Sequence, residues 1–223
     1  MKLLRDAGVL AAKDLRVEFR ARRTLAHIGV LGVLIIVVLA MGLGPSGGPG
    51  AAAPGTVLWI AYLFGGSLCF ERTMAVERQD DALASLLMAP VDRASIFGGK
   101  LAANLVLMLA LALVVTPVGV VLFGLDLSRA PVAFASITAL GLLGFAAVGT
   151  LFSGLAASTR PQGGLVSMLV FPLSLPVVLA STRTLDGLLS SGAAPSSGVP
   201  VLVAFDVLFL IAGWLAFELV LEP

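Results

Sequence analysis

Three residues, Cys69, His27 and Ser67, are of types that bind metal ions or form covalent intermediates. The chain has one histidine and one cysteine, so neither can join others of its kind in a zinc site, a bis-histidine haem site or a disulfide. We interpret Cys69 as a small buried apolar residue and His27 as a polar residue at the end of an apolar run. Ser67 resembles the nucleophile of an intramembrane serine protease, which stays an alternative and predicts loss of function in Ser67→Ala.

A phosphate-binding loop is the second chemistry that the sequence raises. Gly99-Lys100 matches the end of such a loop, but Ala94 stands where the loop needs glycine and Leu101 where it needs serine or threonine. No strand is predicted before it. If ATP is used, another chain must bind it. The sequence therefore predicts no catalytic residue, no metal site and no directly bound cofactor.

Two carboxyl groups, Asp206 and Glu218, fall within the last apolar run. Charge inside a membrane costs free energy and is usually functional. We expect both side chains to lie near the two membrane surfaces and to reach water. The apolar runs carry no chain of carboxylates, which counts against a proton- or sodium-driven carrier. Asn104 is expected to hydrogen-bond between helices rather than to bind a substrate.

Six long apolar runs must position these residues. Hydrophobic residues make up 59% of the chain, its mean hydropathy is +1.08, and roughly 20 apolar helical residues cross a bilayer core. The runs lack period-two alternation, so they indicate helices rather than a barrel. We predict an all-α polytopic membrane protein with one domain over residues 1–223. The candidate spans are residues 24–43, 52–70, 101–123, 132–157, 164–181 and 200–221.

The basic residues predict the orientation of these spans. Arg129 and Arg183 fall on one side of the membrane, and the other twelve basic residues fall on the opposite side. Because basic residues gather in cytoplasmic loops, the N-terminus is predicted to be cytoplasmic, and six spans return the C-terminus to the same side. The twelve are Lys2, Arg5, Lys13, Arg16, Arg20, Arg22, Arg23, Arg72, Arg78, Arg93, Lys100 and Arg160.

Residues 1–23 are predicted to contain an amphipathic helix that lies on the membrane. Its apolar face would carry Leu4, Gly8, Ala11, Ala12, Leu15 and Phe19, and its polar face Asp6, Lys13, Arg16, Arg20 and Arg23. Two interpretations remain open. The helix could orient the protein and bind anionic lipid headgroups, or it could pack beside a partner protein.

The cytoplasmic segment 71–100 is predicted to contain a short capped helix. Asp80 can cap its start, Asp81 suits its first turn, and Pro90 ends it. Asp92 can then cap the helix of the third span. A leucine stripe at helical spacing consists of Leu83, Leu86 and Leu87. This stripe could dock on another protein or rest on the bilayer surface, and periodicity does not separate the two.

Prolines and small residues are predicted to shape the helices. Pro117 falls in the third span, and Pro172 and Pro176 fall in the fifth, where each removes a backbone hydrogen bond. A stripe of small residues in the fourth span consists of Ala146, Thr150 and Gly154. These features suit a bundle that changes shape, although static bends would look the same.

The sequence resembles the CcmB family, the haem exporter B permeases of bacterial cytochrome c maturation, which are related to ABC-2-type transporters. The resemblance covers essentially the whole chain. Its N-terminal part is Lys13-Asp14-Leu15-Arg16-Val17-Glu18. Its first cytoplasmic loop is matched by Glu71, Arg72, Asp81, Leu83, Leu86, Leu87, Pro90 and Lys100. Its fifth span is matched by Gly163-Gly164 followed by Pro172-Leu173-Ser174-Leu175-Pro176.

The resemblance implies a permease that works with a separate ATPase, CcmA, and with CcmC, CcmD and the haem chaperone CcmE. ATP bound by CcmA would drive haem export or the release of haem-loaded CcmE. The short helix at residues 80–89 would be the coupling helix, and two permease copies are expected in a complex. The resemblance also implies the bacterial inner membrane, with no nucleic acid as partner and haem as a possible cargo.

Two further interpretations remain beside this one. An ABC-2-type permease for a drug, a lipid or a polysaccharide would keep the fold and change the cargo. A scaffold that only holds a haem-handling complex together predicts that ATPase activity ignores the leucine stripe.

Overall fold

A computed structural model describes residues 2–20, 22–43, 53–79, 92–158, 165–192 and 197–220. Within these ranges the chain forms seven α-helices and one short 3-10 helix, so the predicted all-α class is confirmed there. The helices are α1 (Lys2–Arg20), α2 (Arg22–Leu43), α3 (Pro54–Gln79), α5 (Arg93–Phe123), η1 (Leu127–Arg129), α6 (Pro131–Ser158), α7 (Leu165–Ser191) and α8 (Gly198–Val220).

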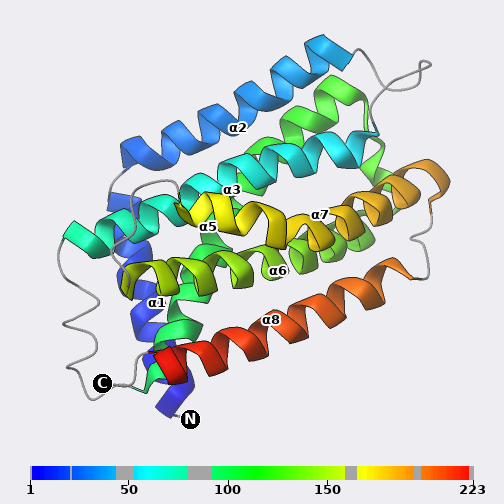
Figure 1. Ribbon diagram of the computed structural model, residues 1–223. Coiled ribbons are helices and arrows are strands. Elements are labelled where there is room, and N and C mark those ends of the chain that lie inside the picture. The colour runs from blue at the N-terminus through cyan, green and yellow to red at the C-terminus, as the bar shows by residue number, and fades with distance from the viewer. Residues whose placement is uncertain are drawn as a thin grey trace.

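The six long helices α2, α3, α5, α6, α7 and α8 form a bundle, and α1 crosses one end of it (Figure 1). The start of α1 and the end of α8 lie at this same end. Helices α3 and α6 are central, since more than half of their described side chains are buried, whereas α2 and α8 lie at the edges. The bundle therefore has an inner pair of helices surrounded by outer ones.

Four helices are long and apolar enough to cross a membrane within the described residues: Arg93–Phe123, Pro131–Gly154, Met168–Ser190 and Gly198–Glu218. Ala26–Gly42 is a shorter apolar helix. Six spans were predicted, and α3 is the helix that falls short in apolarity. Its apolar part includes Trp59, Tyr62 and the pair Gly65-Gly66, which are buried in the bundle but lower the mean hydropathy of the helix.

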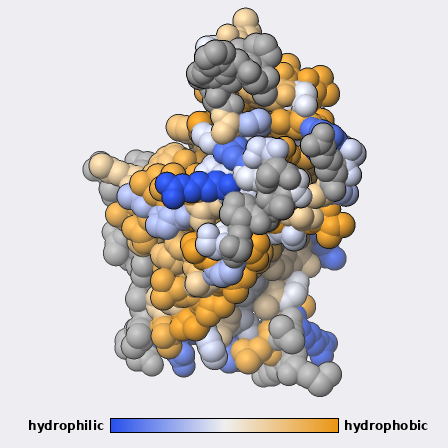
Figure 2. Space-filling view, turned by 90° about the vertical axis from the view of Figure 1, so that its right-hand side faces the viewer, coloured by the Kyte–Doolittle hydropathy of each residue, from blue (hydrophilic) through white to orange (hydrophobic). Residues whose placement is uncertain are grey.

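Apolar side chains cover much of the outside of the bundle. Leu113 and Val121 of α5 and Leu208 of α8 are 77%, 81% and 62% exposed. Viewed from the end opposite α1, hydrophobic residues spread over much of the surface, with hydrophilic residues in smaller groups between them (Figure 2). An apolar surface of this extent fits contact with lipid rather than with water.

The helix ends correct the predicted boundaries of segment 71–100. Helix α3 continues to Gln79, and α5 begins at Arg93. Asp92 caps α5 as predicted, because its side chain accepts a hydrogen bond from the backbone N–H of Ala94 at 3.3 Å. Apolarity marks where a helix lies in the membrane, but a cap marks where it begins, so the helix extends beyond the apolar run.

The predicted helix-shaping prolines lie inside continuous helices. Pro117 lies within α5, and Pro172 and Pro176 lie within α7. All three are exposed, so their rings face outward from the bundle. Their effect on helix motion stays a prediction.

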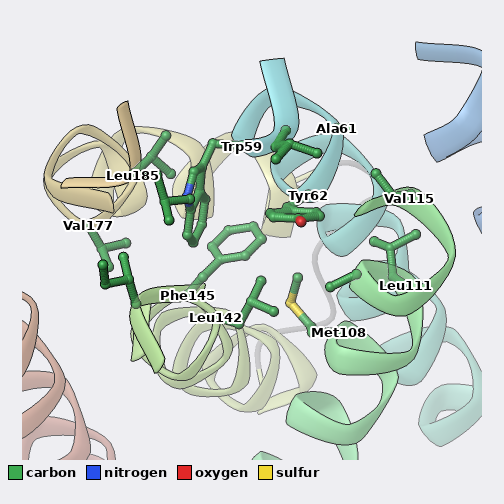
Figure 3. Packing of buried hydrophobic residues seen from close by; sticks show 14 of the residues in the cluster. Trp59, Ala61, Tyr62, Met108, Leu111, Val115, Leu142, Phe145, Val177 and Leu185 are labelled. Carbon is green, nitrogen blue, oxygen red and sulfur yellow. The ribbon is translucent and has the colours of Figure 1, made fainter. Parts of the chain in front are cut away.

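Aromatic residues fill the contact between the two central helices. Trp59 and Tyr62 pack edge to face with centroids 5.6 Å apart, and Phe70 packs in the same way against Phe145 at 5.2 Å. Figure 3 shows the first pair above Phe145 and Leu142 of α6. A Cβ atom on Gly149 of α6 would overlap the ring of Phe70, so this glycine lets α3 and α6 approach closely.

Candidate functional site

Helix α1 lies directly on the first turns of α5, and one glycine of α5, Gly99, sets the closeness of this contact. A Cβ atom on Gly99 would lie 2.7 Å from Cβ of Leu10 and 2.9 Å from the backbone oxygen of Ala7. A Cβ atom on Gly98 would lie 3.6 Å from Cβ of Ala7, which is ordinary contact. The two helices therefore meet backbone to backbone at Gly99.

Charged side chains are buried in this contact. The Lys100 side chain is 6% exposed, and its Nζ lies 4.0 Å from Oδ2 of Asp14 on α1. Oδ1 of Asp14 also pairs with Nζ of Lys13 at 3.2 Å. Glu18 of α1 is 5% exposed. Since a buried charge is costly unless it is paired, the Lys100–Asp14 pair ties the position of α1 to that of α5.

The buried face of α1 differs from the predicted apolar face, which is wrong by part of a turn. Ala11 and Glu18 are buried, whereas Phe19 is 50% exposed and Gly8 and Ala12 are exposed too. The reason is that α1 packs on α5 through Ala7, Leu10 and Ala11, so the position of α5 decides which face of α1 is buried. The exposed side of α1 carries Arg5, Val9, Lys13, Arg16, Val17 and Arg20.

The end of α8 is attached to the same turns of α5. Nη1 of Arg93 donates a hydrogen bond to the backbone oxygen of Glu218 at 3.3 Å. The rings of Phe97 and Phe217 pack with centroids 5.2 Å apart, and Leu10 of α1 packs against the same small cluster. The first turns of α5 thus connect the first and last helices, next to segment 80–91 in the sequence.

A polar network links three helices deeper in the bundle. Nδ2 of Asn104 on α5 donates to Oγ1 of Thr150 on α6 at 2.9 Å, and Oγ1 of Thr73 on α3 donates to Oδ1 of Asn104 at 3.2 Å. The predicted interhelical role of Asn104 is confirmed. In the predicted small-residue stripe, Ala146 and Thr150 are fully buried, and Gly154 contacts Phe217 so closely that a Cβ atom would overlap the ring.

At the opposite end of the bundle, Asp186 of α7 caps the start of α3. Its Oδ1 accepts from the backbone N–H of Gly55 at 2.7 Å, and its Oδ2 accepts from Oγ1 of Thr56 at 3.3 Å. A carboxylate at a helix N-terminus satisfies free N–H groups and interacts favourably with the helix dipole. Sequence analysis missed this contact because its partners are 131 residues apart and no local pattern joins them.

Asp186→Ala is expected to lower the free energy of unfolding by about 1–2 kcal/mol, because it removes the cap of α3 and leaves the Gly55 N–H without its acceptor. Denaturant unfolding in detergent, followed by tryptophan fluorescence, measures the loss. Asp186→Asn keeps an acceptor oxygen and should lose less. Equal stability of the wild type and Asp186→Ala would contradict the capping role.

The remaining predicted coupling residues are only partly placed. Asp81, Leu83, Leu86, Leu87 and Pro90 lie outside the described residues. Glu71 and Arg72 lie near the end of α3, where the Glu71 side chain is partly buried. Lys100 was predicted at the end of an exposed loop, whereas the structure buries it in α5 beneath α1. The coupling roles of all these residues stay predictions.

The structure also places the residues considered for chemistry. Cys69 is buried as predicted, at 3% exposure. Oγ of Ser67 donates a hydrogen bond to the backbone oxygen of Phe64 at 2.8 Å, and His27 is exposed on α2. The two residues therefore do not form a nucleophile–base pair. Glu218 is exposed as expected. Asp206 is only 3% exposed, so the expectation that it reaches water is wrong, because α6 and α7 cover that side of α8.

Comparison with known proteins gives one consistent match. Residues 6–222 match the family model described as CcmB protein. The chain is 30% identical over 217 residues to "Heme exporter protein B" of Bradyrhizobium diazoefficiens, covering 92% of each chain. It is 31% identical over 203 residues to the protein of the same name from Paracoccus denitrificans, covering 89% of this chain and 90% of that protein. It is 26% identical over 192 residues to that of Pseudomonas aeruginosa, covering 86% and 84%.

Proposed function

The chain belongs to the CcmB family, and we propose that it is the membrane-spanning permease subunit of an ABC transporter for cytochrome c biogenesis. In this role it couples ATP hydrolysis by the separate ATPase CcmA to haem export or to the release of haem-loaded CcmE. The observation that carries the proposal is the family match over residues 6–222. ATP is bound by the partner, haem is a possible cargo, and the chain itself needs no bound cofactor and is not an enzyme.

The proposed topology has six spans, α2, α3 and α5 to α8, in the bacterial inner membrane. The four long apolar helices and the shorter Ala26–Gly42 supply five of them. Helix α3 is the sixth, since it lies among the others in the bundle. Both termini are cytoplasmic, in agreement with the twelve basic residues on that side and with α1 and the end of α8 at one end of the bundle.

The proposed coupling path begins in segment 80–91, which would dock in a groove of the ATPase through Leu83, Leu86 and Leu87. Motion there passes into α3 on one side and α5 on the other, because the segment joins the two helices. The first turns of α5 also hold α1 through Gly99 and α8 through Arg93. These contacts support a unit that moves together. Lys100 would act by holding α1 rather than by touching the ATPase.

The proposed assembly contains two permease copies and two copies of the ATPase. It also contains CcmC, CcmD and the chaperone CcmE. Lipid surrounds the bundle, and no nucleic acid takes part. The names of the matched relatives support haem handling as the purpose of this assembly.

Leu86→Glu with Leu87→Glu is expected to reduce the recovery of the ATPase at least about tenfold, because two charges would have to be desolvated in an apolar groove. The tagged chain is extracted from native membranes in mild detergent, and its partners are identified by mass spectrometry. Ser128→Glu with Ser190→Glu is the matched control, since it adds the same charges at exposed residues of the opposite end.

Three outcomes are informative. Recovery of a small ATPase with CcmC-like and CcmE-like proteins supports the cytochrome role, provided that the leucine variant loses the ATPase and the serine control keeps it. An ATPase without those proteins favours an exporter of another cargo. Recovery of no ATPase by the wild type contradicts the ABC assignment.

A further inference from the structure

A group of buried polar atoms lies inside the bundle with no hydrogen-bond partner among the described residues. They are Nε1 of Trp59, Oγ1 of Thr138, Oγ of Ser181 and both carboxyl oxygens of Asp206. The four residues come from α3, α6, α7 and α8 in turn. Buried polar atoms normally have a hydrogen-bond partner, and leaving one without a partner destabilises the folded protein. So many from four different helices point to a site rather than to separate packing defects.

Two glycines of α6 show that these atoms are neighbours. A Cβ atom on Gly141 would overlap both Oγ of Ser181 and the indole ring of Trp59. A Cβ atom on Gly144 would overlap Oδ1 of Asp206. Residues three apart on a helix lie on one face, about 5–6 Å from each other. The hydroxyl of Ser181, the indole of Trp59 and the carboxyl of Asp206 therefore meet adjacent turns of the same face of α6.

Thr138 extends this face by one further turn, since it precedes Gly141 by three residues and is 6% exposed. Figure 3 shows the Trp59 indole between Phe145 of α6 and Leu185 of α7, with its nitrogen on the side of Leu185. All four residues lie in the half of the bundle away from α1, near the start of α3, α6 and α8 and the end of α7.

The surroundings of Asp206 favour its neutral form. A Cβ atom on Gly144 would meet Oδ1 of Asp206, a ring carbon of Phe205 and a methyl carbon of Val177, so the carboxyl lies beside apolar atoms at this point of α6. An ionised carboxylate in a low-dielectric interior, with no hydrogen-bond partner in the part of the chain that the structure describes, costs more free energy than its protonated form. A protonated carboxyl both donates and accepts hydrogen bonds.

The donors and acceptors of the group complement water. Trp59 offers an N–H donor, Ser181 and Thr138 offer hydroxyls that donate or accept, and a protonated Asp206 does both. A buried water molecule needs two to four such partners. A metal cation fits less well. The site holds one carboxyl group, and the positive end of the Trp59 N–H group would repel a cation.

We propose that Asp206, Ser181, Thr138 and Trp59 form a hydrated proton-binding site inside the bundle. Asp206 holds the proton, and ordered water joins its carboxyl to the two hydroxyls and the indole N–H. The site depends on neither the ATPase nor the cargo, so a result that contradicts the site would not contradict the proposed function, and the reverse also holds.

Infrared difference spectroscopy of the full chain in lipid nanodiscs tests the site. The spectrum of the wild type minus that of Asp206→Asn is expected to contain a carboxylic-acid C=O band. The band should shift when H₂O is replaced by D₂O, because water reaches the site and exchanges the proton. Ser181→Ala should also shift the band, since the carboxyl loses a water-mediated partner. Ser136→Ala on the exposed side of α6, where the hydroxyl bonds to the Ala133 backbone at 3.0 Å, should leave it unchanged.

Loss of ionised-carboxylate bands in Asp206→Asn would overturn the proposal, as would an acid band that ignores D₂O or Ser181→Ala. If Asp206→Asn does not fold, Asp206→Glu replaces it. That variant keeps the acid, so the band should persist at a different frequency, and an unchanged band would likewise overturn the assignment.

Discussion

Gly99→Ala is expected to loosen α1 from α5 and to accelerate the hydrogen exchange of α1 amides about tenfold or more. The added Cβ atom would lie 2.7 Å from Cβ of Leu10 and 2.9 Å from the backbone oxygen of Ala7, and neither atom is the flexible end of a side chain. Overpacking of this kind costs about 1–3 kcal/mol, and 1.4 kcal/mol is a factor of ten in an equilibrium constant. Hydrogen–deuterium exchange with mass spectrometry measures the opening of α1.

Gly98→Ala is the matched control for this prediction. It adds the same methyl group one residue away, where the new Cβ atom would lie 3.6 Å from Cβ of Ala7. Its exchange rates should match those of the wild type. If the proposed coupling unit is correct, Gly99→Ala should also reduce the yield of mature cytochrome c. Equal protection of α1 in the two variants would mean that Gly99 does not set the contact.

Gly149→Ala is expected to lower the free energy of unfolding by about 1–3 kcal/mol. Its Cβ atom would overlap the ring of Phe70, which is fully buried and held edge to face against Phe145. The ring cannot move without separating the two central helices. Denaturant unfolding in detergent gives the change, and Phe70→Leu combined with Gly149→Ala should recover part of it.

Gly42→Ala is the control for this second variant. Gly42 lies in α2 with no atom within 4 Å of its added Cβ position, so alanine should be neutral or stabilise the helix by up to about 1 kcal/mol. A loss in Gly42→Ala as large as that in Gly149→Ala would show that the glycine-to-alanine change itself, rather than the Phe70 contact, causes the destabilisation.

Local and periodic signals made part of the structure predictable. The apolar runs predicted the all-α class, and the position of Asp92 between Pro90 and the third apolar run predicted its cap on α5. The burial of Cys69 and the interhelical bond of Asn104 followed from their types within apolar runs. Each of these inferences uses residues close together in the chain or the general cost of leaving polar groups unpaired in lipid.

Contacts between distant residues were beyond that reasoning. The cap of Asp186 on Gly55, the buried position of Asp206 and the face of α1 all depend on which helices pack together. Apolarity predicted a span at residues 52–70, but it did not show that this span becomes α3, a helix at the centre of the bundle. Apolarity also predicted that segment 71–100 begins and ends where the apolar runs stop. In the structure α3 continues to Gln79 and α5 begins at Arg93, so both helices extend into this segment.

Helix α5 is continuous over its whole length, so it can transmit a tilt from one end to the other. Its 31 residues form one helix about 46 Å long, with the contacts to α1 and α8 at its N-terminal end and Pro117 near its C-terminal end. A tilt of the helix by about 5° about its N-terminal end would displace its C-terminal end by about 4 Å, given a rise of about 1.5 Å per residue. A rigid tilt of α5 would therefore turn a small movement at its N-terminal end into a larger displacement at its C-terminal end.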